Sequence, residues 1–481
     1  MMQDFVNTPQ RLPDKKDAEV RKRDFHEIYL GFSAKRAREQ SGRCAQCGIP
    51  FCQTKCPLHN NIPDWLMLVS EGRMREAYEV ASATNTFPEI CGRICPQDKL
   101  CEGECVIEQA GHGTVTIGSV ENHIVETAFE NGWALPRLPK RERTEKVAII
   151  GAGPAGLAAA EMLRSYGYQV DVYDRYDRVG GLLIYGIPNF KLEKYVVQRR
   201  EQQLREQGVT FILNTEISDL EKLRRCYDSV LIATGVYKTK TLRLPGEELE
   251  GVVKALDFLR ASNQKGLGDT VRNFDNGILN AHGKKVVVIG GGDTAMDCVR
   301  TAIRQGAKTV TCLYRRDREN MPGSQREIKH ADEEGVKFIW LSAPRALTGN
   351  RSGGVRAVSA IKMELGARDS SGRQKPQPVE GSEFTVKADM VIQSLGFDPE
   401  DIQENMKTPG LSVTPWGTII TNHQTKMTNL ENVYAAGDIV RGSSLVVWAI
   451  RDGRDAARQI HLRLLKRYDK TPVTTAAEMA S

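Results

Sequence analysis

Eight of the eleven cysteines lie in two groups of four near the amino terminus. The first group is Cys44-x2-Cys47-x4-Cys52-x3-Cys56-Pro57, and the second is Cys91-x3-Cys95-Pro96-x4-Cys101-x3-Cys105. Residues 1–30 are charged throughout and lack the apolar stretch of an export signal, so we expect a cytoplasmic protein. In that reducing compartment, clustered cysteines indicate metal binding rather than disulfides.

The spacing of these cysteines favours two 4Fe–4S clusters. Three closely spaced thiolates plus one distant thiolate commonly hold such a cluster, and a cysteine before proline often serves the neighbouring cluster. Two four-cysteine zinc sites would use the same eight thiolates and remain the alternative. Structural zinc prefers paired C-x2-C units, however, and only Cys44 and Cys47 form one.

The order of the cysteines predicts how they divide between the clusters. Cys44, Cys47 and Cys52 form a compact triplet that can reach three irons of the first cluster, and Cys105 is expected to return to it as the fourth ligand. The expected ligands of the second cluster are Cys56, Cys95 and Cys101. That set is one ligand short, and Cys91 is the simplest candidate for the missing place.

A change of pattern at residue 146 predicts a nucleotide-binding unit. An apolar strand, Val147–Ile150, leads into the turn Gly151-Ala-Gly-Pro-Ala-Gly156, a helix over Leu157–Tyr166 and a second strand, Val170–Tyr173, that ends at Asp174. In this context the glycines allow the turn, the approach of a pyrophosphate and the packing of helix on strand. A turn that is glycine-rich for structural reasons alone is the alternative.

The predicted ligand of this first unit is FAD. The helix amino terminus supplies N–H groups to phosphates, and Asp174 would accept hydrogen bonds from ribose hydroxyls, so the ligand carries no 2′-phosphate there. The expected contacts in the turn are Gly151, Gly153, Pro154, Ala155 and Gly156.

The same pattern occurs a second time, which indicates an internal duplication. Lys285–Ile289 is followed by the turn Gly290-Gly-Gly-Asp-Thr-Ala295, a helix to about Gln305 and a strand over Thr309–Tyr314. The two units also end alike, in Val-Leu-Ile-Ala-Thr-Gly235 and Met-Val-Ile-Gln-Ser-Leu-Gly396. The expected contacts of the second unit are Gly290, Gly291, Gly292, Asp293 and Thr294. At the matching strand ends, Gly235 in the first unit and Gly396 in the second are also expected contacts.

The second unit is predicted to bind NADPH. Its second strand ends in Arg315 and Arg316, where an acidic residue would select NAD, and guanidinium groups favour a 2′-phosphate through charge-assisted bonds. A solvated pair of surface arginines is the alternative. Two dinucleotide folds, one for FAD and one for NADPH, imply hydride transfer from nicotinamide to flavin. That transfer needs no acid or base from the protein, so no catalytic residue is expected.

The carboxyl-terminal part is expected to return to the FAD unit. The segment Asn432-Val-Tyr-Ala-Ala-Gly-Asp438 reads as a strand end before a helix. There Asp438 would bond the ribityl or pyrophosphate region of the flavin, and Gly437 would permit its close approach.

These sites require an α/β protein in which an N-terminal helical iron–sulfur domain precedes two nested Rossmann-like domains. The expected ranges are 1–140 for the helical domain with two 4Fe–4S clusters, 145–270 and 401–470 for the FAD domain, and 284–400 for the NADPH domain. The chain has 481 residues, 40% of them hydrophobic, a formal net charge of +6 and no long basic run, so we expect neither nucleic-acid nor membrane binding.

Three local structures are also predicted. Apolar residues at helical spacing indicate one amphipathic helix over Ile62–Thr84. Glycine and asparagine between the two units indicate a loop over Ala261–Lys284. The stretch Gly349–Gly381 is read as an excursion around a strand at Val355–Leu365.

Taken together, the motifs resemble the small (beta) subunits of NADPH-dependent glutamate synthases over residues 20–470. The matching segments are Arg43–Cys52, Cys91–Pro96, Gly151–Gly156, Gly180-Gly-Leu-Leu-Ile-Tyr-Gly-Ile-Pro188, Gly290–Asp297 and Ala435–Asp438. The module also looks like the electron-input part of dihydropyrimidine dehydrogenase.

The resemblance implies that NADPH reduces FAD and that electrons leave through two 4Fe–4S clusters. It adds Gly181 and Leu182 to the expected cofactor contacts, and it implies a hetero-oligomer with a large (alpha) subunit that makes L-glutamate from L-glutamine and 2-oxoglutarate. An NADPH-dependent flavin and iron–sulfur subunit that feeds another acceptor, as in dihydropyrimidine dehydrogenase, is the alternative.

The resemblance also bears on the missing ligand of the second cluster. The related dehydrogenase module uses a downstream oxygen-bearing side chain, and the matching position in this chain is Glu121. We therefore expect Glu121 to be the ligand and keep Cys91 as the alternative. A plain surface carboxylate is the non-functional interpretation of Glu121.

The sequence argues against an enzyme of the thioredoxin-reductase type. Such an enzyme needs a redox-active C-x-x-C near the flavin, and the NADP half holds only the widely separated Cys298 and Cys312. A zinc-bound interaction module joined to a redox sensor would be colourless, whereas a flavin and iron–sulfur protein would absorb visible light.

Overall fold

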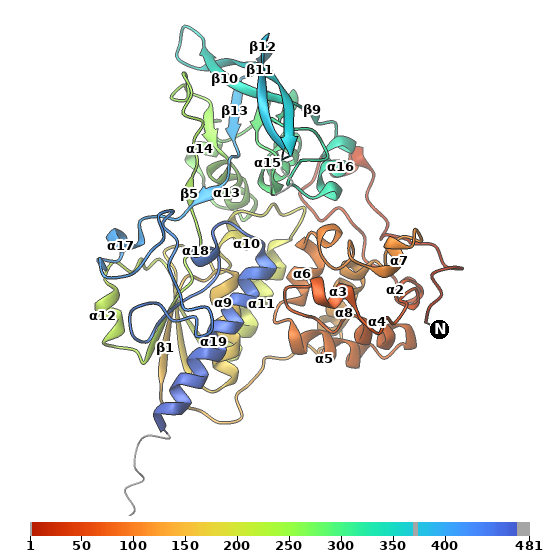
Figure 1. Cartoon of the computed structure of the whole chain (residues 1–481), viewed down its shortest axis with the longest axis vertical. Coiled ribbons are helices and arrows are strands. Elements are labelled where there is room, and N and C mark those ends of the chain that lie inside the picture. Colours follow the sequence, from red (N-terminus) through yellow and green to blue (C-terminus); the bar gives the residue numbers. More distant parts are fainter. Residues whose placement is uncertain (1, 369–373, 469–481) are drawn as a thin grey trace, which may run out of the picture. The chain divides into compact units, whose positions relative to one another are not determined.

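The computed structural model describes residues 2–368 and 374–468, and within them the chain divides into two compact units. The first unit comprises Met1–Trp133, Leu182–Val197 and Lys238–Asp398. The second unit comprises Ala134–Gly181, Gln198–Tyr237 and Pro399–Ser481. Because the chain passes between the units several times, each one is assembled from distant segments of sequence (Figure 1).

The N-terminal part of the first unit is helical. Its elements are α1 (Ala18–Arg21), α2 (Ala34–Gly42), α3 (Phe51–Lys55), α4 (Ile62–Glu71), α5 (Met74–Thr84), α6 (Pro88–Ile94), the 3-10 turn η1 (Gln97–Lys99), α7 (Val106–Gln109) and α8 (Ile117–Glu130). Trp65, Val69, Val120 and Ile124 are fully buried in its core. Short helices joined by cysteine-bearing turns therefore form the predicted helical domain.

The prediction of one helix over Ile62–Thr84 is wrong, because the segment forms two helices. Gly72 ends α4 in the left-handed conformation with φ +82°, and Arg73 precedes α5. A glycine adopts that backbone without strain and commonly ends helices. The apolar spacing on either side of Gly72 nevertheless continues at helical period, which is why the break is hard to see in the sequence.

The second unit contains the first Rossmann-like sheet, with strand order β15-β4-β1-β2-β3 and all pairs parallel. The strands are β1 (Lys146–Ile150), β2 (Gln169–Tyr173), β3 (Val209–Ile212), β4 (Ser229–Ile232) and β15 (Val433–Ala435). Helices α9 (Pro154–Ser165) and α19 (Val446–Tyr468) pack together, with α12 (Leu220–Arg224), α17 (Ile402–Asn405) and α18 (Asp438–Arg441) nearby in this unit. The carboxyl-terminal segment thus returns to this sheet as β15.

The first unit contains a second sheet of the same design, with order β6-β13-β7-β8-β9 and all pairs parallel. Its strands are β6 (Val252–Lys254), β7 (Lys285–Ile289), β8 (Thr309–Leu313), β9 (Lys337–Ile339) and β13 (Met390–Gln393). Its helices are α13 (Ala255–Gly266), α14 (Arg272–Asp275), α15 (Asp293–Arg304) and α16 (Gln325–Glu333). The order of its four strands β13-β7-β8-β9 repeats that of β4-β1-β2-β3 in the first sheet, as the duplication predicts.

Smaller elements complete the chain. An antiparallel sheet joins β10 (Ser342–Gly349), β11 (Val355–Arg368) and β12 (Gln374–Lys387), and a short pair joins β5 (Lys238–Thr239) to β14 (Phe397–Asp398). Helices α10 (Leu182–Tyr185) and α11 (Lys194–Glu206) follow the first glycine unit. The predicted excursion around Val355–Leu365 is therefore a three-stranded sheet, and residues 369–373 of it lie outside the described structure.

Two sequence-based boundaries differ from the structure. The expected FAD range 145–270 includes β6, which pairs with β13 in the second sheet. The expected loop Ala261–Lys284 includes the end of α13 and all of α14. Residues 469 and 470, at the end of the expected range 401–470, lie outside the described residues.

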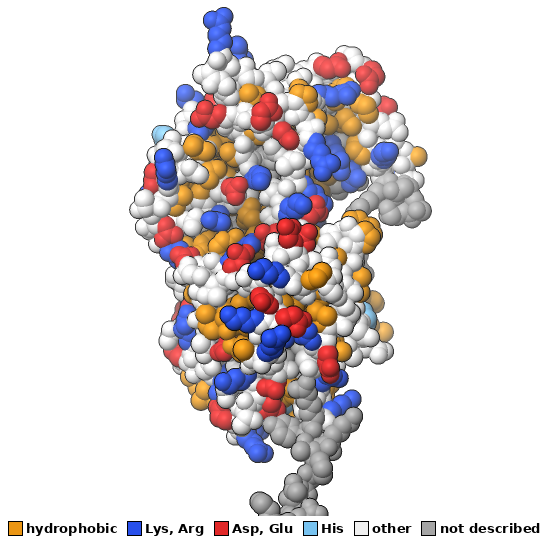
Figure 2. All heavy atoms as spheres, turned by 90° about the vertical axis from the view of Figure 1, so that its left-hand side faces the viewer, with side chains coloured by type: hydrophobic (Ala, Val, Ile, Leu, Met, Phe, Trp, Pro, Cys, Tyr) orange, Lys and Arg blue, Asp and Glu red, His pale blue; other side chains and the backbone are white. Residues whose placement is uncertain are grey.

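Charged side chains of both signs are interspersed over the face drawn in Figure 2, without one large basic field. Within the described residues, no helix combines the length and apolar character that crossing a bilayer requires.

Candidate cofactor-binding sites

The first glycine turn leaves open space above a helix amino terminus. Gly153 is the N-cap of α9, no side chain caps that helix, and a Cβ at Gly153 would meet no heavy atom within 4 Å. Gly151 has φ +111°, and a Cβ there would lie 2.4 Å from the carbonyl oxygen of Ala233. Unpaired N–H groups facing open space suit a phosphate, as predicted for this turn.

Asp174 lies directly after β2 and holds the turn in place. Its carboxylate accepts hydrogen bonds from the backbone N–H of Ala152 (2.7 Å) and of Tyr176 (2.9 Å). Burial raises its pKa despite these bonds. The residue lines a cavity together with Arg175, Tyr176 and Tyr237, and that cavity is where the ribose and base of a dinucleotide would lie in this fold.

Gly181 and Gly235 lie near the first glycine turn, and Leu182 follows directly in the chain. A Cβ at Gly181 (φ +55°) would lie 2.9 Å from the Cα of Gly153, so the two glycines are in close contact. Gly235 has φ +71° and follows Thr234, whose hydroxyl is buried without a hydrogen-bond partner. Leu182 begins α10, which belongs to the first unit.

The return segment brings Gly437 and Asp438 to α9. Gly437 has φ +80°, and a Cβ there would lie 2.9 Å from the Cβ of Ala155. Asp438 begins α18, and its carboxylate accepts a hydrogen bond from the Ser444 hydroxyl (3.0 Å). Burial raises its pKa. Pro154, Ala155 and Gly156 form the first turn of α9.

The second glycine turn has the same local structure in the first unit. Gly292 is the N-cap of α15, again without a side-chain cap and with open space at its Cβ position. Gly290 (φ +148°) lies against Ser394, and the ring of Tyr314 packs on Gly291. Asp293 and Thr294 form the first turn of α15, and Gly396 has φ +93° after β13. This turn therefore fits a second pyrophosphate.

The two arginines after β8 differ in environment. Arg315 is exposed, whereas Arg316 is half-buried and its Nε is buried without a hydrogen-bond partner. A buried donor with no acceptor is unfavourable unless a ligand supplies one. The arrangement suits a phosphate group at the end of β8.

Thr234 and Ser394 were missed by sequence reasoning. Thr234 follows β4 and Ser394 follows β13, both contact the first glycine of the adjoining turn, and both carry a buried hydroxyl with no partner. The signal was present in the match between the strand ends at Gly235 and Gly396, where a hydroxyl residue occurs in each.

Four cysteines of the helical part surround one apolar cavity. Cys44, Cys47, Cys52 and Cys105 line it together with apolar residues that include Leu66 and Ile117. Burial raises the pKa of Cys44 to about 11 and that of Cys52 to about 12. Burial in this apolar cavity favours the protonated thiols, and bound iron would instead favour their thiolate form. The set fits the first predicted cluster.

A second group comprises Cys56, Cys91, Cys95, Cys101 and Glu121. Burial raises the pKa of Cys56 to about 11, with Glu121 and Cys91 adding to the effect. A hydrogen bond with Cys91 and burial raise the pKa of Cys95. Burial also raises the pKa of Cys101, with Cys56 and Glu121 among its neighbours. Both candidates for the last ligand, Glu121 and Cys91, thus lie beside the expected three.

Glu121 is buried and held by two amides. One carboxylate oxygen accepts hydrogen bonds from Asn60 (3.1 Å) and Asn85 (3.0 Å), and burial raises the pKa of Glu121 to about 8. The plain surface carboxylate considered from the sequence does not describe this residue, which is 6% exposed. The Cys91 thiol instead lies 3.8 Å from the amide oxygen of Asn85.

The donor sets suit clusters better than single ions. Among the described residues, no three His, Cys, Asp or Glu side chains meet closely enough to hold one metal ion. In a 4Fe–4S cube each iron takes one ligand, so the ligands stand further apart than they do around a zinc ion.

Comparisons with known proteins show which families the two parts of the chain resemble. Residues 21–133 match the family described as dihydropyrimidine dehydrogenase domain II, 4Fe-4S cluster, and residues 145–453 match pyridine nucleotide-disulphide oxidoreductase. The chain is 62% identical over 477 residues to the glutamate synthase (NADPH) small chain of Azospirillum brasilense, covering 98% of each chain. It is 46% identical over 464 residues to that of Escherichia coli K12, covering 94% of this chain and 97% of the relative.

Among solved structures, the oxidoreductase FprA of Mycobacterium tuberculosis has a TM-score of 0.57 and 21% identity, covering 68% of this chain and 86% of that one. At this identity the likeness concerns the fold of the two sheets alone.

Proposed function

The chain belongs to the family of glutamate synthase (NADPH) small chains, and from this membership we propose the part that each of its sites plays in delivering electrons for glutamate synthesis. It is an NADPH-dependent oxidoreductase with FAD and 4Fe–4S clusters as cofactors. When bound, FAD accepts a hydride from NADPH, and the clusters carry the electrons onward singly. The observation that carries the proposal is the presence of two glycine turns and two cysteine groups in one chain.

The compact unit that contains the first sheet, β15-β4-β1-β2-β3, would hold FAD. The N–H groups at the start of α9 would bind its pyrophosphate, and Asp174 would accept from ribose hydroxyls. Gly151, Gly181 and Gly437 would let the chain pack closely around this turn, because a Cβ at each would meet neighbouring protein atoms within 3.0 Å, and Gly153 would leave the open space. Asp438 would bond the ribityl or pyrophosphate region.

The second sheet would hold NADPH. The start of α15 would bind the pyrophosphate, and Arg315 and Arg316 would bind the 2′-phosphate. The unpartnered Nε of Arg316 supports this assignment, because a phosphate oxygen would satisfy it. No side chain needs to move a proton, so the residues of this sheet act by binding and orienting the nicotinamide.

The helical part would hold both clusters. We assign Cys44, Cys47, Cys52 and Cys105 to the first, supported by the cavity that all four line. We assign Cys56, Cys95, Cys101 and Glu121 to the second, with Cys91 as the alternative to Glu121. The neighbours that act on the buried Glu121 include two amides and the carboxylate of Glu89. Burial disfavours the charged carboxylate and a bound metal would stabilise it, which supports a metal as its partner.

The partner would be the large subunit of a glutamate synthase in a cytoplasmic hetero-oligomer. The relatives are small chains by name, which supports a larger partner for this chain. The cysteines are free, as suits a reducing compartment. An acceptor of the dihydropyrimidine dehydrogenase kind is the alternative, because the helical part matches that family description.

The purified chain tests this function directly. It should show flavin absorbance with a broad iron–sulfur envelope, and it should oxidise NADPH with an artificial electron acceptor without forming glutamate. Addition of a glutamate synthase large subunit should yield NADPH-dependent glutamate. A colourless preparation, or glutamate formed by this chain alone, would contradict the proposal.

A further inference from the structure

A short segment of the second sheet, residues 322–326, contacts the turn that joins Cys95 to Cys101. The hydroxyl of Ser324 donates to Asp98 (3.1 Å), and the backbone N–H of Gln325 donates to the other Asp98 oxygen (3.2 Å). The ammonium group of Lys99 donates to the carbonyl oxygens of Gly323 (2.8 Å) and Pro322. Both segments belong to the first unit.

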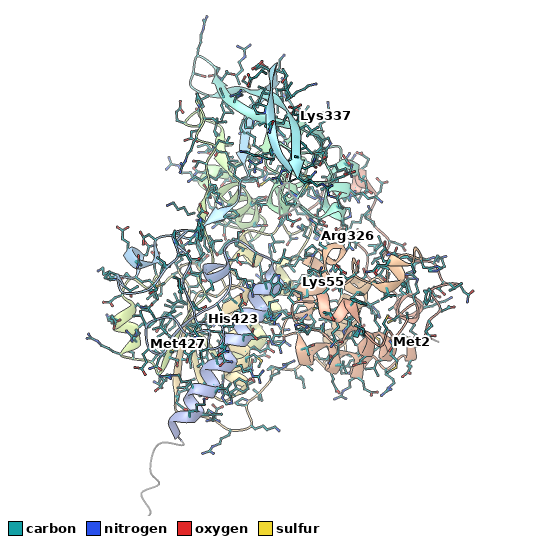
Figure 3. All side chains as sticks on the ribbon, in the orientation of Figure 1. Met2, Lys55, Arg326, Lys337, His423 and Met427 are labelled. Carbon is teal, nitrogen blue, oxygen red and sulfur yellow. The ribbon has the colours of Figure 1, made fainter. Side chains whose placement is uncertain are left out.

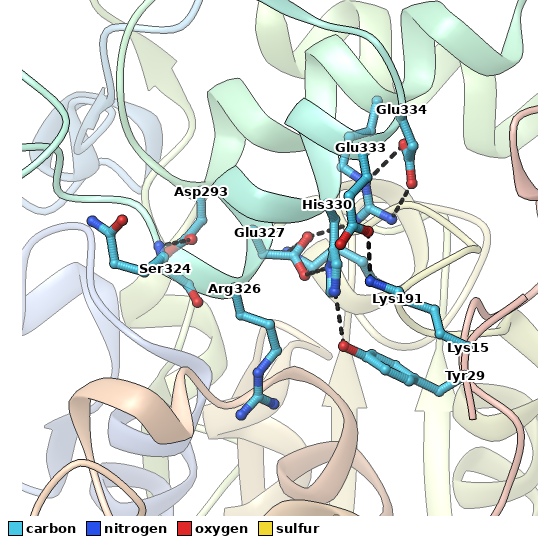
Figure 4. A network of polar contacts seen from close by, with 12 residues as sticks. Lys15, Tyr29, Lys191, Asp293, Ser324, Arg326, Glu327, His330, Glu333 and Glu334 are labelled. Carbon is cyan, nitrogen blue, oxygen red and sulfur yellow. Dashed lines mark hydrogen bonds and ion pairs between the residues drawn. The ribbon is translucent and has the colours of Figure 1, made fainter. Parts of the chain in front are cut away.

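Arg326 makes the charged contact in this group. Its guanidinium donates to Gln97 Oε1 (3.0 Å) and to Glu102 Oε2 (2.7 Å). In Figure 4 its side chain points away from the neighbouring cluster of Glu327, His330 and Glu333, toward the helical part, and Figure 3 labels it at the same place. Arg326 thereby bridges the two ends of the turn that carries Cys95 and Cys101.

The partners of Arg326 are buried and lead to the second cysteine group. Gln97 is 3% exposed and donates to the carbonyl oxygens of Cys91 (3.1 Å) and Gly92 (3.2 Å). Glu102, next to Cys101, is 4% exposed and accepts from the N–H of Gly118 (3.0 Å). Movement of either partner would therefore move the backbone that carries the thiols.

The same segment is bonded to the second glycine turn. The N–H of Gly323 donates to the carbonyl oxygen of Gly291 (3.0 Å), and that of Ser324 donates to Asp293 Oδ1 (2.9 Å). The nucleotide turn and the cysteine turn are thus joined through only five residues, 322–326. Through this connection, Arg326 links the nucleotide turn to the part of the chain that carries the cysteines.

We propose that Arg326 is a positioning residue for the second cluster: it fixes the turn between Cys95 and Cys101 and places a positive charge beside it. The proposal rests on the function given above. Reduction adds an electron to a cluster, and a fixed cation favours that added negative charge. Loss of the cation should make the second cluster harder to reduce.

The test compares Arg326→Gln with Arg326→Lys in the full chain, with Lys329→Gln as the matched control. Lys329 is exposed on the same helix and makes none of these contacts. Each purified variant is titrated with a mediator-buffered reductant, and the reduced clusters are followed by electron paramagnetic resonance alongside counts of iron and labile sulfide. This measures a midpoint potential, which a purely structural residue would leave unchanged.

Arg326→Gln should lower the midpoint potential of the second cluster, while the first cluster and Lys329→Gln keep that of the unmodified chain. Arg326→Lys should restore most of the potential, since the charge remains. Unchanged potentials in Arg326→Gln with full iron and sulfide would overturn the proposal, and so would an equal shift in Lys329→Gln. If Arg326→Gln loses the second cluster, retention of that cluster in Arg326→Lys supports the proposal and its loss there overturns it.

The opposite charge change gives a second test. Glu102→Gln removes a negative charge from the same contact and should raise the potential, and the double variant with Arg326→Gln should lie close to the unmodified chain. A double variant that keeps the lowered potential of Arg326→Gln would overturn the proposal. Absence of iron and labile sulfide from the unmodified chain would instead contradict the proposed function, so the two failures are distinguishable.

Discussion

Glu121 and Cys91 compete for the last place among the ligands of the second cluster. Glu121→Ala should lose that cluster, because the remaining thiolates Cys56, Cys95 and Cys101 leave one iron without a protein ligand. Cys91→Ser should keep both clusters. Counts of iron and labile sulfide in the purified variants measure this difference.

Glu130→Ala is the control for the Glu121 variant, since Glu130 is exposed on the same helix, α8. Retention of both clusters in Glu121→Ala together with loss of one in Cys91→Ser would show that the thiol is the ligand. In that case the amides of Asn60 and Asn85 would hold Glu121 for a structural reason.

The preference for NADPH over NADH is expected to depend on Arg315 and Arg316. Replacement of both by alanine should raise the Michaelis constant for NADPH far more than that for NADH, because only NADPH carries the 2′-phosphate. Each charge-assisted bond contributes about 1.5–3 kcal/mol, or roughly one to two decades of affinity. Steady-state kinetics with both nucleotides measure the ratio.

Arg345→Ala serves as the control for that experiment, since Arg345 pairs with Glu380 in the antiparallel sheet and has no place in the nucleotide turn. An equal loss for NADPH and NADH in the double variant would mean that the two arginines maintain the structure of the loop after β8.

Among single residues, the sequence predicted those whose type follows from backbone geometry or from metal chemistry. Gly151 and Gly290 were predictable because a left-handed turn beside a strand demands glycine. Arg326 was not predictable, because nothing near it in sequence tells which distant turn its guanidinium reaches. Thr234 and Ser394 were accessible only by aligning the two halves, since one hydroxyl residue by itself carries little signal.

Among the elements, α15 and α16 are joined by buried charges. Glu334, at the end of α16, is 1% exposed and bonds both Arg300 (2.9 Å) and Arg304 of α15. Arg21 of the N-terminal helix α1 also contacts it (3.1 Å). Figure 4 shows Glu334 beside Glu333 at this junction. Glu334 therefore contacts three cations from two other helices, of which Arg300 also pairs with Glu327 and Arg21 with Glu333.

Glu334→Gln should destabilise the first unit strongly. The change removes the carboxylate that pairs with the fully buried Arg304, and breaking a buried pair typically lowers the free energy of unfolding by about 3–5 kcal/mol. Asp332→Asn on the same helix is the matched control, because Asp332 (40% exposed) pairs with Arg318 (47% exposed) and such surface pairs contribute about 1 kcal/mol or less. Urea unfolding monitored by far-UV circular dichroism measures both, and equal effects would contradict the expectation.

The same carboxylate predicts a dependence of stability on pH. Burial acts to raise the pKa of Glu334, but Arg300 and Arg304 outweigh it and hold that pKa below its ordinary value of 4.5. A group with a lowered folded pKa stabilises the fold above its unfolded pKa and loses that contribution as the pH falls through the folded value. The stability difference between the unmodified chain and Glu334→Gln should therefore shrink below about pH 4.5.

The elements themselves were predictable where apolar runs are continuous, as in β1, β4 and β7, because strands of a parallel sheet are buried on both faces. Strand β6 has only three residues and gave no such signal. Strand β12 is mostly exposed, so its sequence shows little apolar alternation. The helix α13 was hidden by the glycine and asparagine residues near its end, although Phe258 and Leu259 bury its core-facing side.

Across the whole chain, one sheet design is used twice with a different chain order. In the first sheet the outer strand beside β4 is β15, which comes from the carboxyl-terminal segment. In the second sheet the matching strand beside β13 is β6, which precedes the glycine turn. The first sheet can therefore be completed only after the second sheet has been synthesised. This explains why the sequence revealed a return segment before Asp438 but not the boundary between the two sheets.

Removal of the first cluster should separate hydride input from electron output. Cys105 belongs to the second cysteine group in sequence but lines the cavity with Cys44, Cys47 and Cys52. Cys105→Ser should therefore lower iron and labile sulfide to roughly half, since each 4Fe–4S cluster needs its four ligands. NADPH should still bleach the flavin absorbance at close to the original rate, because both glycine turns remain, whereas glutamate formation with a large subunit should be lost.

Stopped-flow absorbance measures the flavin step and an amino-acid assay measures glutamate, with Cys226→Ser as the control because Cys226 is exposed and belongs to neither group. Loss of flavin bleaching in Cys105→Ser would show that the helical part is needed for the nucleotide sites themselves. Retention of glutamate formation would show that electrons leave without the first cluster.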